Sequence, residues 1–97
     1  MEIATYKYHL TLSLEQYADG RPGLGKNLEI DFEHYQELFR LIDTLNQRNP
    51  FSNEEQLATF IIGLKMFSEV MIKNLNHPLF EELSAAYRPF MMKLKRL

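Results

Sequence analysis

From Tyr6 to Leu14 the chain alternates strictly between apolar and polar residues, which is the period-two pattern of a half-buried β-strand. A second run, from Leu28 to Glu33, alternates in the same way, with acidic residues at its polar positions. The segment between the two runs contains several glycines and a proline, which favour turns. The pattern therefore predicts an antiparallel β-hairpin with a long loop, its strands at about residues 4–14 and 27–33.

After the hairpin, apolar residues recur with the period of 3.6 that is typical of amphipathic helices. We expect three helices, at about residues 34–48, 53–75 and 78–96. Ser52 to Glu55 fits a capping box that would start the second helix. Because Pro89 removes one backbone N–H and disfavours helical geometry at Arg88, we expect the last helix to be kinked or split at Pro89. The predicted fold class is α+β: an antiparallel β-hairpin followed by three helices (ββααα), in a single domain over residues 1–97.

The second predicted helix is apolar on two opposite sides. The wider stripe is expected to face the core and has eight members: Leu57, Phe60, Ile61, Leu64, Phe67, Met71, Ile72 and Leu75. A second stripe of Ile62, Met66 and Val70 recurs every four residues on roughly the opposite side. Such a helix needs two partners. Either other elements of this chain cover both sides, or part of the second stripe is a homodimer surface.

Three charged residues, Lys65, Glu69 and Lys73, form a narrow ridge between the two stripes. Their spacing of four residues allows weak ion pairs, so we expect a solvated ridge, with a polar contact to a partner as the alternative. The ridge and the second stripe together form the predicted partner or oligomer surface. Gly63 lies within the same helix, where it either marks a close approach of another backbone or is merely tolerated.

Composition narrows the classes of function. With 97 residues, 45% of them hydrophobic and 25% charged, the chain has the make-up of one globular domain. A net charge of −2 provides no positive field for a nucleic acid, so no nucleic-acid partner is expected. The absence of cysteine excludes disulfides, thiolate metal sites and cysteine nucleophiles. Neither a secretory signal in residues 1–7 nor a membrane span is apparent, so we expect a cytoplasmic protein without a membrane partner.

The segment from Gly20 to Asn27 matches most of a phosphate-binding loop, but the match fails on chemistry. Asn27 has no hydroxyl for magnesium, Pro22 lacks an amide N–H, and the loop leads into a strand rather than a helix. We therefore expect a plain hairpin loop.

The three histidines, His9, His34 and His77, lack the spacing of zinc ligands. His77 is expected to cap or flank a helix start. Lys7, His9 and the basic C-terminus form too sparse a set for a convincing nucleic-acid footprint. The sequence thus assigns no catalytic residue, no cofactor-binding residue and no metal ligand.

Two sequence blocks carry a family resemblance. They run from Gly63 to Met71 and from His77 to Leu83, and the motif closes with Phe90 and Leu94-Lys95. Over essentially its whole length the chain resembles short bacterial proteins of domain-of-unknown-function family 3861. The resemblance implies a stand-alone cytoplasmic bacterial protein, and it brings no reaction, ligand or catalytic residue.

These observations favour a small non-enzymatic protein-interaction or accessory domain that forms a homo-oligomer or binds a protein partner still to be identified. The alternative is a small ligand-binding domain or enzyme whose site assembles only in three dimensions, near Lys65, Glu69, Lys73 and His77. No cofactor is expected in either case.

Overall fold

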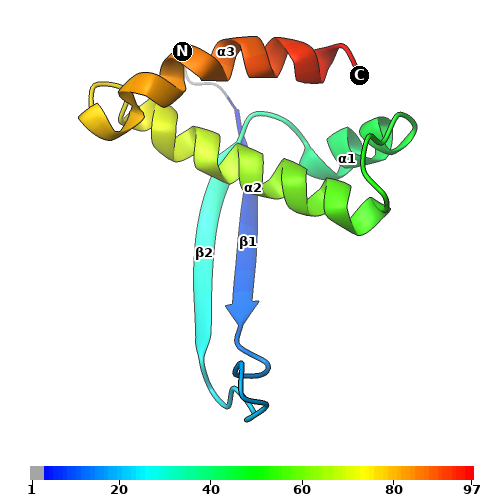
Figure 1. The fold of residues 1–97 in the computed structure, drawn as a ribbon, viewed down its shortest axis with the longest axis vertical. Helices are drawn as coiled ribbons and strands as arrows, with labels where there is room; N and C mark the ends of the chain where they lie inside the picture. Colours follow the sequence, from blue (N-terminus) through cyan, green and yellow to red (C-terminus); the bar gives the residue numbers. More distant parts are fainter. Residues whose placement is uncertain (1–3) are drawn as a thin grey trace. The chain divides into compact units, whose positions relative to one another are not determined.

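The computed structural model describes residues 4–97, so the expectation about a secretory signal in residues 1–7 lies partly outside it. The chain divides into two compact units, a hairpin unit that ends at Tyr35 and a helical unit from Gln36 to Leu97. Two antiparallel strands are followed by three α-helices and one short 3-10 helix (Figure 1). The predicted α+β class and the order of hairpin and helices are confirmed.

The hairpin unit consists of β1 (Tyr6–Ser13) and β2 (Asn27–His34). Three directly opposed pairs form its apolar face: Tyr8 with Phe32, Leu10 with Ile30, and Leu12 with Leu28. The rings of Tyr8 and Phe32 stack with their centroids 5.2 Å apart. Because Tyr6 pairs with His34, β2 continues through a residue that was expected to begin the first helix.

The long loop of the hairpin is held by backbone hydrogen bonds. Leu14 N–H donates to the Lys26 carbonyl over 3.0 Å, and Gly23 N–H donates to the Glu15 carbonyl over 3.0 Å. A Cβ on Gly23 would lie 1.9 Å from the carbonyl oxygen of Leu14, so only glycine fits this close approach. The segment that imitates a phosphate-binding loop therefore serves as a hairpin connection.

The helical unit begins with α1 (Leu38–Asn46) and α2 (Glu54–Lys73). The predicted first helix started four residues too early, because the side chain of Glu37 accepts from Arg40 N–H and caps α1 there. The expected capping box at Ser52 is wrong by one residue. Asn53 is the N-cap of α2, and its side chain accepts from Gln56 N–H over 2.8 Å.

The last element has two pieces, the 3-10 helix η1 (Pro78–Phe80) and α3 (Glu81–Lys95). His77 caps η1 as expected, since its Nδ1 accepts from Leu79 N–H over 3.1 Å. α3 runs through Pro89 without a break, so of the two expected outcomes, a kink or a split, the split does not occur. Contacts on both sides of the proline explain this, because Tyr87 bonds to Ser68 and the Phe90 ring packs on Phe60 of α2.

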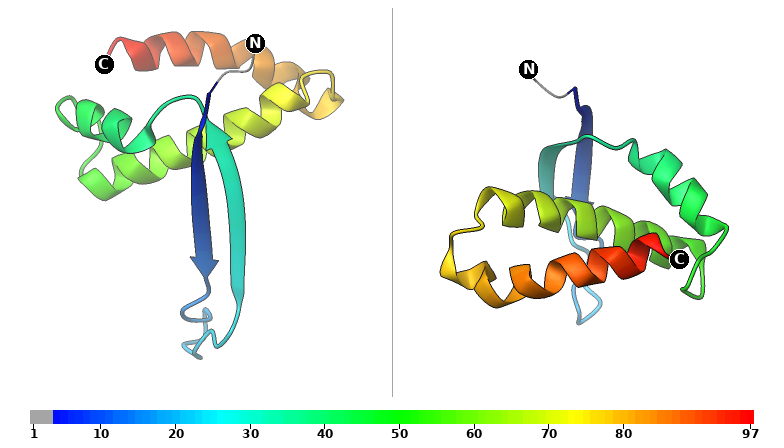
Figure 2. Two further views of the ribbon diagram at one scale, coloured as in Figure 1. Left: turned by 180° about the vertical axis from the view of Figure 1, so that it is seen from behind. Right: turned by 90° about the horizontal axis from the view of Figure 1, so that it is seen from above.

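α2 and α3 lie side by side (Figure 2). The buried apolar residues of the helical unit come from α1, α2 and η1, and none from α3: Leu38, Leu57, Ile61, Met71 and Phe80. Edge-to-face ring contacts join Phe51 to Phe60 and Phe67 to Phe80. Across residues 4–97, none of the helices is long and apolar enough to cross a membrane.

Candidate functional site

The buried side of α2 differs from the stripe that the sequence pattern predicts. Leu57, Ile61 and Met71 are buried as expected, but Lys65 and Ser68 are buried with them. Lys65 and Ser68 fall on this side because a helix turns by about 100° per residue, which puts each of them within roughly 40° of the direction of Ile61. The predicted core residues Phe67, Ile72 and Leu75 are exposed instead.

Lys65 was expected in a solvated ridge, and this expectation is wrong: only 7% of the residue is exposed. Burial, with a smaller contribution from the positive charge of Lys95, lowers the pKa of the Lys65 ammonium below its usual 10.5. Among the described residues, no ion pair joins Lys65, Glu69 and Lys73. The methylene groups of Lys65 thus belong to the buried side of α2, together with the apolar residues there; we call this the packed side of α2.

Ser68 and Tyr87 tie α2 to α3 at a half-buried hydrogen bond. The Ser68 hydroxyl donates to the carbonyl of Leu64 over 2.7 Å. Because this uses the only proton of the serine, the Tyr87 hydroxyl is the donor in the bond between the two side chains. The arrangement gives each of the two hydroxyls a hydrogen-bond partner inside the helical unit.

The six residues of the predicted partner surface have different environments. Ile62, Met66 and Glu69 are half-buried, Val70 and Lys73 are exposed, and Lys65 is buried. Within residues 4–97, no three His, Asp or Glu side chains come together as a metal site.

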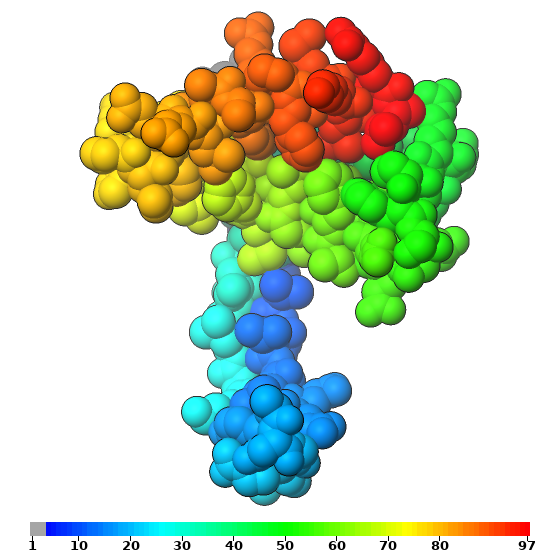
Figure 3. All heavy atoms as spheres, viewed as in Figure 1, coloured from blue at the N-terminus to red at the C-terminus, as the bar shows by residue number. Residues whose placement is uncertain are grey.

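One exposed stripe of α2 is uncharged. Five exposed residues follow one another along it: Gln56, Thr59, Gly63, Phe67 and Val70. Phe67 is 42% and Val70 56% exposed. We call these five residues the outer face of α2. Figure 3 shows atoms of α2 at the surface beside those of α3. Phe67 and Val70 are three residues apart and therefore lie on one side of a helix, which could have indicated this face. The sequence pattern instead assigned Phe67 to the stripe that was expected to face the core.

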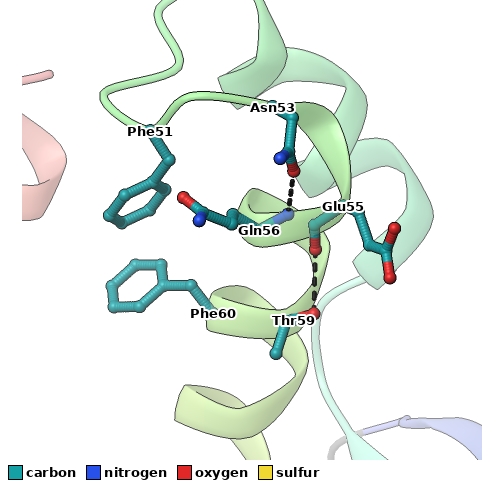
Figure 4. A pocket seen from close by; sticks show the side chains of 6 residues that line it. All are labelled: Phe51, Asn53, Glu55, Gln56, Thr59 and Phe60. Carbon is teal, nitrogen blue, oxygen red and sulfur yellow. Dashed lines mark hydrogen bonds between the residues drawn. The ribbon is translucent and has the colours of Figure 1, made fainter.

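A shallow, open hollow of about 520 Å³ lies at the N-terminal end of the outer face. Its lining is aromatic and polar: Phe51, Asn53, Glu55, Gln56, Thr59 and Phe60. The Phe51 and Phe60 rings lie 5.2 Å apart on one side of it. Figure 4 shows the carboxylate of Glu55 directed away from the two rings. The hollow therefore suits an apolar side chain, and none of Lys65, Glu69, Lys73 and His77 lines it.

The polar face of the hairpin carries a small charged cluster. His9 Nδ1 lies 2.6 Å from Asp31 Oδ1, and its Nε2 lies 3.1 Å from Glu29 Oε1. The hydrogen bond to Asp31, followed by the one to Glu29, raises the pKa of His9 above its usual 6.5. All three side chains are exposed, so the cluster is a solvated feature of the hairpin rather than an enclosed site.

We expect the His9 imidazole to titrate above pH 6.5 when followed by NMR. Because the folded pKa is raised, the contribution of His9 to hairpin stability is complete below pH 6.5 and is lost as the pH rises through the raised value. Asp31→Asn should move the titration back toward 6.5. A midpoint at or below 6.5 in the unsubstituted protein would contradict the hydrogen bonds of His9 to Asp31 and Glu29.

Comparison with known proteins agrees with this fold. A family model, described as a domain of unknown function with a solved structure (DUF3861), matches residues 6–96. A crystal structure of a protein of unknown function from Pectobacterium atrosepticum has a TM-score of 0.83 and 32% identity, over 97% of this chain and 100% of that one. No curated protein gives a significant match. The chain therefore belongs to the DUF3861 family.

Proposed function

We propose that this chain is a small non-enzymatic interaction domain of the bacterial cytoplasm, and that it binds a protein partner through the outer face of α2. The observation that carries the proposal is the chemistry of this face. A helix side that faces water normally carries charged residues. The five exposed residues of the outer face include no charge, and two of them, Phe67 and Val70, are large and apolar.

The hollow at the end of the outer face supports the same proposal. Aromatic side chains are enriched in protein interfaces, and a concave site beside projecting apolar residues offers a place for an anchoring side chain. Phe51 and Phe60 supply the aromatic wall of such a site. The alternative of a polar ligand site near Lys65, Glu69, Lys73 and His77 has no comparable support, because the hollow is lined by other residues.

A photo-crosslinking side chain placed at Val70 in the native cell tests the proposal. Val70 is 56% exposed, so the change should not disturb the fold. We expect a discrete crosslinked product from this position. The matched control is the same side chain at Glu82, an exposed position in the first turn of α3. If both positions give the same products, or neither gives any, the outer face is not the contact surface.

A further inference from the structure

The outer face of α2 is symmetric in its spacing about Gly63. Thr59 and Phe67 lie four residues on either side of Gly63, and Gln56 and Val70 lie seven residues on either side. At a rise of 1.5 Å per residue, these pairs stand about 6 Å and about 10 Å from Gly63 along the helix axis. A two-fold axis that passes beside Gly63, between two helices, would therefore place Phe67 of one helix at the level of Thr59 of an antiparallel copy.

The two halves of the outer face also differ in shape in a complementary way. The half before Gly63 is hollowed between Thr59, Gln56 and the Phe51 and Phe60 rings. The half after Gly63 carries the projecting side chain of Val70 and the partly exposed ring of Phe67, which also packs edge-to-face on Phe80. An antiparallel copy would bring the projecting half of each helix onto the hollowed half of the other. No third molecule is needed to fill either half.

Gly63 itself has no explanation within the helical unit. Glycine inside a helix is unfavourable relative to alanine, and a Cβ placed on Gly63 would have no atom within 4 Å. A close approach of another part of the helical unit, Gln36 to Leu97, is therefore not the reason for a glycine here. The missing side chain would allow the backbones of two helices to approach closely at the centre of a contact.

Charge also favours a second copy. In an isologous contact, each side chain near the axis meets its own counterpart, so a charged residue would face a like charge. The outer face contains no charged residue, and the Glu55 carboxylate at the rim of the hollow is directed away from the aromatic rings (Figure 4). The face can thus meet itself without repulsion.

We infer that the partner of the outer face is a second copy of this chain, in an antiparallel contact about Gly63 with Phe67 of each copy seated in the hollow beside Phe51 and Phe60 of the other. This inference rests on the proposed function and names its partner. It also supplies a partner for Val70, the exposed member of the second apolar stripe of α2.

Analytical ultracentrifugation of the purified chain tests the association. We expect a dimer at concentrations on the order of 10–100 µM, and Phe67→Asp should raise its dissociation constant by at least about tenfold. Circular dichroism checks that the variant keeps its helices. Phe39→Asp is the matched control, because Phe39 is more exposed than Phe67 but lies on α1, outside the outer face. A monomer at all these concentrations, or equal effects of both substitutions, overturns the inference.

Cysteine crosslinking tests the antiparallel geometry, and the natural chain contains no cysteine to interfere. A mixture of Gln56→Cys and Val70→Cys chains carrying tags of different size should form a mixed disulfide dimer under mild oxidation. Either variant alone should not, because two copies of the same position would lie about 21 Å apart along the helix axes. Rapid crosslinking of each variant with itself would indicate a parallel contact and overturn the inference.

Gly63→Ala separates a contact role from a merely structural one. Alanine should stabilise the isolated helix, yet it should weaken the dimer because a methyl group enters the closest part of the contact. Unchanged or tighter dimerisation would overturn the proposed axis. If the purified chain is monomeric while the crosslinker at Val70 captures a different protein in cells, the proposed function stands and the second copy is excluded.

Discussion

Leu57→Ala should lower the free energy of unfolding by about 2–5 kcal/mol. Leu57 is completely buried in the second turn of α2, where it shares the packed side with Ile61. Removing three carbon atoms would forfeit their transfer free energy and leave a cavity that the rigid neighbours fill only in part. The loss is large compared with the stability of a domain of this size, so part of the population should be unfolded at physiological temperature.

Urea denaturation followed by the helical circular dichroism signal would measure this loss. Leu79→Ala is the control, since it removes the same atoms from a residue that is 74% exposed. We expect the control to change the free energy of unfolding by less than about 0.5 kcal/mol. Similar losses for both variants would mean that Leu57 is not packed as described.

Gly23→Ala should disrupt the loop of the hairpin unit. The added Cβ would meet the carbonyl oxygen of Leu14 at 1.9 Å and the carbonyl carbon at 2.5 Å, and both are backbone atoms that cannot rotate away. The loop must shift, which should break the Gly23 to Glu15 and Leu14 to Lys26 hydrogen bonds. Steric strain of this kind typically costs about 1–3 kcal/mol.

Amide hydrogen exchange would detect the change locally. We expect the Leu14 amide to exchange at least about tenfold faster in the Gly23→Ala protein, the rate equivalent of 1.4 kcal/mol. Leu24→Ala is the matched control, because Leu24 lies next to Gly23 in the same loop and is 86% exposed. Equal protection of Leu14 in both variants would show that the close approach at Gly23 does not constrain the loop.

The strands and the number of helices could be predicted because each signal is local. Alternation from Tyr6 to Leu14 depends only on neighbouring residues, and the pairing of Tyr8 with Phe32 follows once the hairpin forms. The boundaries were less accurate, because Ser52 and Asn53 are both good N-caps and the sequence does not show which of them takes the extended conformation.

The buried side of α2 could not be predicted in the same way. Periodicity gives the relative directions of Ile61, Lys65 and Phe67 around the helix, but not the direction from which the other helices approach. The neighbouring helices settle this direction: Tyr87 of α3 bonds to Ser68 on the side where Lys65 is buried, while Phe67 stays 42% exposed. The candidate contact face was hidden for the same reason, since it depends on which apolar residues remain uncovered.

Because Lys65 is buried, its chemical reactivity can report how often the packed side of α2 opens. Amine-reactive reagents modify the neutral form of lysine, and the lowered pKa of Lys65 increases that fraction once a reagent arrives. Only 7% of Lys65 is exposed while the helical unit is folded as described. The rate at which Lys65 is acylated, relative to exposed Lys73 on the same helix, would therefore follow how often the packed side of α2 opens.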